Sequence, residues 1–144
     1  GNIGQAVPMP TIPEAAKASL GVDADGRLSD ADLRRRITDH LMENRAFQLT
    51  MKRAADDARA SNGPSNTAAI MKYAGAKIAQ ERNELMVEAL GHQGLGWEGE
   101  DFSASDLAAM RTMLRSKANS IEGGTSEINL NIVSKRVLGL PDAK

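Results

Sequence analysis

Apolar residues recur at steps of three and four along most of this 144-residue chain, which is the spacing of one face of an α-helix. The first such stretch runs from Ser29, as N-cap, to about Ala60. Its apolar positions are Leu33, Ile37, Leu41, Phe47, Met51, Ala54 and Ala58. No window shows the alternation of period two, with β-branched residues, that predicts a strand. The chain is therefore predicted to be all-α.

A second helix is predicted after the stop at Ser61-Asn62-Gly63-Pro64, because Gly tolerates a left-handed cap and Pro cannot continue a helix. Ser65 or Asn66 can cap it, and its apolar face extends to Ala89. Two long consecutive helices usually pack antiparallel.

The third and fourth helices follow a glycine-containing loop. Ser103 and Asp106 form the pattern of a capping box and begin the third helix, which reaches about Ile121. Thr125 or Ser126 can cap the fourth helix, which Gly139 and Pro141 end. Together these segments predict an antiparallel four-helix bundle.

The first 28 residues differ in composition, because three of the five prolines, Pro8, Pro10 and Pro13, fall there. We predict an N-terminal arm, or the remnant of an upstream linker, with at most a short helical turn from Pro13 to Leu20. Asp23-Ala24-Asp25-Gly26 is then a turn and not a calcium loop, because the further oxygen ligands do not follow. Residues 29–144 make up the predicted bundle domain.

Composition excludes several kinds of function. A net charge of −1 disfavours nucleic-acid binding, and Arg34-Arg35-Arg36 is interpreted as a solvated cluster. Zero cysteines exclude disulfides and thiolate metal sites. No apolar run is long enough to span a membrane, and we predict a cytoplasmic protein.

Metal binding and hydrolase chemistry have little support in the sequence. His40 and His92 each lack a second histidine at ligand spacing, so no metal site is predicted, and His40 is interpreted as a structural residue with a hydrogen-bond partner. There is no Gly-x-Ser-x-Gly turn for a serine nucleophile. The glycine loop at 91–99 follows a helix and not a strand, which favours a turn over a phosphate-binding loop.

The segment Ile121-Glu122-Gly123-Gly124-Thr125 precedes the fourth helix and is the strongest candidate site. Two glycines let the backbone approach a ligand closely, and free N–H groups at a helix start favour negative charge. Glu122 can act as a general base if burial raises its pKa. A hinge with a solvated glutamate is the alternative interpretation, and the residues alone leave both open.

Two segments of the chain closely resemble the acyl-CoA dehydrogenase family. One is Ser120–Ile128 continued by Asn131–Pro141, which matches the C-terminal signature of that family. The other, Glu84–Leu95, is similar to the step from an apolar helix to a glycine loop. The resemblance covers approximately residues 29–141 and implies the C-terminal helical-bundle domain of the family.

The resemblance implies an FAD-dependent enzyme that removes an α-proton from an acyl-CoA thioester while a hydride passes from the β-carbon to the flavin, giving a 2,3-enoyl-CoA. It also implies fatty acid metabolism, an electron-transfer flavoprotein or similar acceptor, and assembly into a dimer or tetramer or with a paired dehydrogenase subunit. The family has two further domains before this bundle. We therefore expect the chain to be the C-terminal part of a longer enzyme, inactive by itself.

The site residues come from the same two segments. The resemblance assigns cofactor contacts to Glu88, Ala89, Leu90, Gly91, His92, Ile121, Gly123, Gly124 and Thr125, and the catalytic base to Glu122. In one group of these enzymes the base directly precedes Gly-Thr, a position that Gly123 occupies here. That departure keeps an alternative open, a non-catalytic helical module that retains the bundle for oligomerisation.

Overall fold

Helices make up most of the structure, a computed structural model that describes residues 9–60 and 67–142. The elements are α1 (Ile12–Leu20), α2 (Ala31–Ala60), α3 (Thr67–Ala89), the 3-10 helix η1 (Gly91–Leu95), α4 (Ala104–Ser116), the 3-10 helix η2 (Lys117–Ser120), α5 (Ser126–Ile132) and the π-helix η3 (Val133–Val137). Within the described ranges, the β structure consists of one isolated bridge between Val22 and Leu28. The all-α prediction is confirmed.

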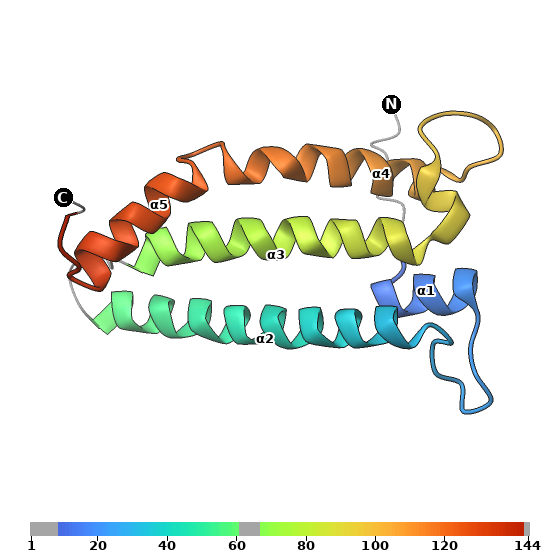
Figure 1. Cartoon of the computed structure of the whole chain (residues 1–144), viewed down its shortest axis with the longest axis horizontal. Coiled ribbons are helices and arrows are strands. Elements are labelled where there is room, and N and C mark those ends of the chain that lie inside the picture. Colours follow the sequence, from blue (N-terminus) through green and yellow to red (C-terminus); the bar gives the residue numbers. More distant parts are fainter. Residues whose placement is uncertain (1–8, 61–66, 143–144) are drawn as a thin grey trace.

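The central helix is α3, which contacts α1, α2, α4 and α5. In Figure 1, α2 and α3 run antiparallel, α4 returns along the other side of α3, and α5 continues the path of α4. The short α1 lies at the end where α2 begins. The described part of the chain has five α-helices and not the predicted four, because α1 is an additional helix. The predicted third and fourth helices correspond to α4 and α5, which share one side of α3.

Helix α1 replaces the predicted arm over residues 12–20. Thr11 and Glu14 form a capping box, in which the Thr11 backbone N–H donates to Glu14 Oε2 at 2.8 Å and Glu14 N–H donates to Thr11 Oγ1 at 3.4 Å. Ile12, Ala15 and Ala16 are buried. The predicted bounds, Pro13 to Leu20, agree with this helix within one residue, but the element is more than a short turn because a complete cap and a buried face stabilise nine residues as helix.

The core lies at the end of the molecule where α1, the start of α2 and the end of α3 meet. Its buried residues are Ile12, Ala15, Ala16, Leu28, Leu33, Ile37, Leu85, Met86, Ala89, Leu90 and Ala109. His40 is the last buried residue along α2, and its Nδ1 lies 3.1 Å from Glu81 Oε2. His40 thus has the hydrogen-bond partner that the sequence analysis expected.

The helix ends agree with the sequence patterns in most places. Ser103 and Asp106 form the predicted capping box of α4, and Thr125 caps α5. At the start of α2 the cap is Asp30 and not Ser29, since Asp30 Oδ1 accepts from Leu33 N–H at 2.9 Å. The predicted stop at 61–64 and the cap at 65 or 66 lie outside the described residues.

Candidate functional site

The signature segment forms a tight turn between η2 and α5. Gly123 and Gly124 have φ angles of 67° and 103°, a region in which a side chain is strained, so both positions require glycine. Thr125 Oγ1 accepts from Ile128 N–H at 3.3 Å and begins α5. The buried Asn129 side chain donates to the carbonyls of Gly124 and Thr125 at 3.0 and 2.9 Å and fixes the turn from the inside.

Two polar side chains of α3 fix the residues that precede this turn. Lys72 Nζ donates to the Asn119 carbonyl at 2.7 Å. Gln80 Nε2 donates to the Ser116 carbonyl at 3.1 Å and to Ser120 Oγ at 3.2 Å. The sequence analysis did not identify either residue, because nothing local in α3 indicates which distant carbonyl a side chain will meet.

Glu122, the predicted base, lies at the surface in an ion pair with Arg115. Arg115 Nη2 donates to Glu122 Oε2 at 2.8 Å, and the glutamate side chain is 49% exposed. The hydrogen bond from Arg115, with a smaller contribution from the charge of Lys72, holds the pKa of the Glu122 carboxyl below its usual value. Partial burial raises this pKa less than Arg115 lowers it, so the carboxylate is ionised and weakly basic.

The second predicted segment lies at the C-terminal end of α3. Glu88 accepts both guanidinium N–H groups of Arg36 at 2.7 Å, a bidentate pair that joins α3 to α2. Ala89 and Leu90 are buried in the core, with 0% and 9% of their surface exposed. Ala89 therefore presents no surface to a ligand in this chain and Leu90 very little, and the Leu90 N–H and carbonyl are already hydrogen-bonded to Met86 and Gln93.

The two predicted segments do not form one site within the chain. Gly91 and His92 follow α3 at its end, and the His92 side chain is exposed. The signature turn lies beside the start of α3, since a Cβ on Gly123 would be 3.5 Å from Lys72 Cε. At a rise of 1.5 Å per residue, Lys72 and Glu88 are separated by about 24 Å along α3. A single ligand must be extended, or a second chain must complete the site, for both segments to contact it.

Residues 9–60 and 67–142 contain neither a metal-binding cluster nor a membrane-spanning helix. Within these ranges, no group of three His, Asp or Glu residues has the geometry to hold a metal ion. Among the described helices, none combines the length and the apolar character that a membrane span requires.

The comparison that decides the family covers nearly the whole chain. The family model described as "Acyl-CoA dehydrogenase, C-terminal domain" matches residues 11–138. The chain belongs to the acyl-CoA dehydrogenase family. The match begins at the N-cap of α1, so the residues interpreted as an arm from Thr11 onward are included in the family domain.

Two known proteins are similar to this chain, one over half of its length and one over most of it. The acyl-CoA dehydrogenase IpdE1 of Mycolicibacterium smegmatis is 36% identical over 72 residues, which are 50% of this chain and 17% of that relative. The crystal structure of the ChsE4-ChsE5 complex from Mycobacterium tuberculosis has a TM-score of 0.63 and 25% identity, covering 92% of this chain and 34% of the solved chain. The chain thus spans about a sixth of the length of IpdE1 and about a third of the solved chain.

Proposed function

We propose that this chain is the C-terminal helical domain of an FAD-dependent acyl-CoA dehydrogenase that forms a 2,3-enoyl-CoA from an acyl-CoA thioester. The observation that carries the proposal is the family match over residues 11–138, which includes the glycine turn. An electron-transfer flavoprotein or similar acceptor, and a second dehydrogenase subunit, belong to the same proposal. The structural similarity to a chain of a two-component complex supports the paired subunit.

The signature turn has the features that a flavin contact requires. Gly123 and Gly124 present main chain without side chains, and Ile121 is 66% exposed beside them, so a planar ring can approach both backbone and an apolar surface. In the other segment the exposed His92 and the main chain of Gly91 are the available groups. When bound, FAD supplies the hydride acceptor.

Glu122 is the acid in this turn that can receive the α-proton. Its carboxylate is ionised because Arg115 lowers its pKa, so it is in the form that accepts a proton. The same ion pair makes it a weak base, and proton transfer therefore requires the carboxylate to leave Arg115. Arg115 is thus the residue that controls whether Glu122 is available.

The test uses the full-length protein that contains this domain. We expect it to purify with a visible flavin band that bleaches when acyl-CoA is added, and we expect Glu122→Gln to prevent bleaching while the flavin stays bound. Glu127→Gln is the matched control, because Glu127 is the neighbouring acid in the first turn of α5 and should leave bleaching unchanged. Normal bleaching in the Glu122 variant would exclude this residue as the base.

A non-catalytic oligomerisation module is the second candidate function. Two observations favour it: Gly123 occupies the position that directly precedes Gly-Thr, and Glu122 is bound to Arg115 at the surface. In that case the full-length protein would show no flavin band and would still assemble with a second subunit. Size-exclusion chromatography combined with the absorption spectrum separates the two functions.

A further inference from the structure

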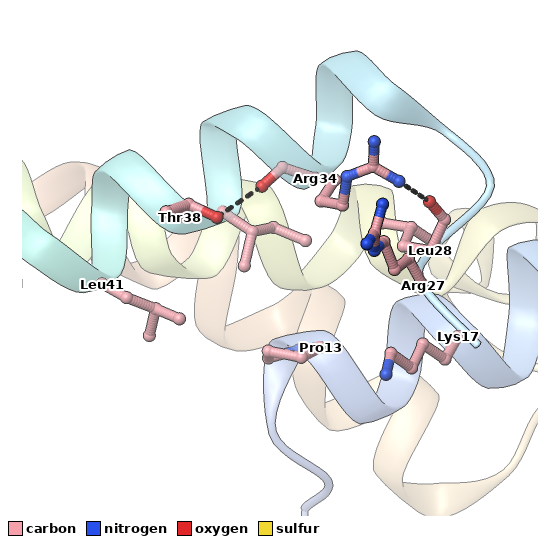
Figure 2. A pocket seen from close by; sticks show the side chains of 8 residues that line it. Pro13, Lys17, Arg27, Leu28, Arg34, Thr38 and Leu41 are labelled. Atoms are coloured by element: carbon pink, nitrogen blue, oxygen red, sulfur yellow. Dashed lines mark hydrogen bonds between the residues drawn. The ribbon is translucent and has the colours of Figure 1, made fainter. Parts of the chain in front are cut away.

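A small pocket lies between α1, the loop at residues 21–30 and α2, and none of its lining residues belongs to the two candidate segments described above. Its volume is about 200 Å³. Leu28 and Ile37 form an apolar floor, each only 4% exposed, and Pro13 and Leu41 line its sides. Figure 2 shows Pro13 on α1 and Leu41 on α2, facing the same space. An aliphatic group placed here would bury part of its surface against these apolar side chains.

Three cations from three different elements line the same pocket. Lys17 comes from α1, Arg27 from the loop and Arg34 from α2 (Figure 2). Arg34 is held in place because its Nη1 donates to the Leu28 carbonyl at 2.7 Å, which leaves other N–H groups of its guanidinium for a ligand. The Lys17 ammonium has no hydrogen bond or ion pair to any residue in the described part of the chain.

The nearby carboxylates Asp23 and Asp25 offset only two of the three positive charges, through long ion pairs. Asp23 Oδ2 is 3.7 Å from Arg34 and Asp25 Oδ2 is 3.6 Å from Arg27, and both separations exceed hydrogen-bond distance. Asp23 Oδ1 instead accepts from the backbone N–H groups of Asp25 and Arg27 at 3.0 and 2.9 Å, which fixes the loop. Three cations and two carboxylates leave one positive charge in excess at the pocket.

We propose that this pocket binds a short aliphatic carboxylate, with its head group on the three cations and its chain on the floor made by Leu28 and Ile37. A guanidinium matches the geometry of a carboxylate, and a pocket of about 200 Å³ is below the range of roughly 300–1,000 Å³ that holds larger ligands. The proposal goes beyond the dehydrogenase function, because it needs neither a flavin nor Glu122.

The test is calorimetric titration of the 144-residue chain with hexanoate, acetate and 1-hexanol at low ionic strength, after circular dichroism has confirmed its helical content. We expect hexanoate to bind with a dissociation constant on the order of 1 mM. Acetate lacks the chain and hexanol lacks the charge, so each should bind about tenfold more weakly. Equal binding of acetate and hexanoate, or no binding of hexanoate, would overturn the proposal.

Variants locate the binding. Lys17→Gln and Arg27→Gln should each weaken hexanoate binding about threefold to tenfold. Arg35→Gln is the matched control, because Arg35 belongs to the same helix as Arg34 but pairs with Asp32 and Asp39 outside the pocket. An Arg35 variant that weakens binding as much as the Arg27 variant would show a general effect of charge and would contradict the proposed site.

The apolar floor and walls are tested separately. Leu41→Asn should weaken hexanoate but not acetate, since Leu41 lines the pocket and can contact only the chain of the ligand. Met42→Asn is its control, because Met42 is the next residue, is 66% exposed and lies outside the pocket lining. Because all these titrations are done without flavin, their failure leaves the dehydrogenase proposal untouched.

Discussion

At the scale of single residues, the ion pair between Arg115 and Glu122 determines how the signature turn responds to pH. Because Arg115 lowers the pKa of Glu122 in the folded state, the pair stabilises the fold above the usual carboxyl range. This contribution is lost as the pH falls through the lowered pKa. The turn therefore carries an ionised glutamate throughout the neutral range, whether or not that glutamate takes part in catalysis.

Replacing Arg115 by Gln should raise the pKa of Glu122 toward its ordinary value, because the hydrogen bond and the positive charge are both lost. An NMR titration of the side-chain carboxyl measures this pKa directly. Arg111→Gln is the control, since Arg111 lies one turn earlier on α4 and contacts the Trp97 ring and carbonyl instead. An unchanged pKa of Glu122 in the Arg115 variant would show that the ion pair does not form in solution in the unmodified protein.

At the scale of elements, the step from α3 into η1 depends on one glycine. A Cβ on the buried Gly94 would lie 2.1 Å from the Val87 carbonyl oxygen, so Gly94→Ala must displace the backbone of α3 or η1. We expect this variant to lower the free energy of unfolding by about 2 kcal/mol, measured by urea denaturation. Gly26→Ala is the comparison variant that has backbone strain without a steric clash. Gly26 has a φ of 73°, but a Cβ added there would have no heavy atom within 4 Å.

The Gly26 variant should cost about 1 kcal/mol, the usual penalty of a left-handed backbone for a residue with a side chain. A Gly94 variant as stable as the Gly26 variant would mean that η1 relaxes away from α3 without loss.

The helix ends also show what the sequence can predict. Ser103 and Thr125 were identified as caps because a capping pattern is local, and Gly123 was identified as a break for the same reason. For α1 the sequence predicts the bounds within one residue but only a short turn, because the three prolines among the first 28 residues indicate an arm and the small buried face behind the Thr11 capping box is not a local signal. Local signals therefore gave most boundaries of the fold.

The site was harder to predict than the fold because its contacts are not local. Glu122 could be chosen from the motif, but its partner Arg115 is seven residues away across a turn, where helical spacing no longer applies. Lys72 and Gln80 reach the turn from another helix, which requires knowledge of how α3 and α4 pack. The sequence thus proposes two candidate segments, and the structure adds the side chains that hold the glycine turn in place.

At the scale of the whole molecule, packing is uneven along the long axis. The cluster of buried residues lies near the start of α2, and no residue of α2 after His40 is buried. Stability should follow this distribution, because few buried contacts oppose local opening of the second half of α2. Exposed apolar residues there, including Met42 and Leu49 at 66% and 51%, agree with a helix that is completed by a partner.

Hydrogen exchange tests this gradient. Amides of α2 beyond His40 should exchange about tenfold or more faster than those between Leu33 and His40, and than those around Leu85 in α3. Peptide-resolved mass spectrometry on the isolated chain gives both rates in one experiment. Uniform protection along α2 would show that its outer half is stabilised as strongly as the core.

The central place of α3 determines where this domain can tolerate a change in length. Deleting one residue inside α3 would rotate every following side chain by about 100° and shift it by 1.5 Å, which would misalign α3 with α2 and with α4 and α5 together. The same deletion in the last turns of α2 would disturb the packing of one helix pair. A deletion in the loop between Gly96 and Ser103 would disturb the packing of no helix pair. Insertions and deletions in this domain are therefore expected in that loop and at the end of α2, while α3 keeps a fixed length.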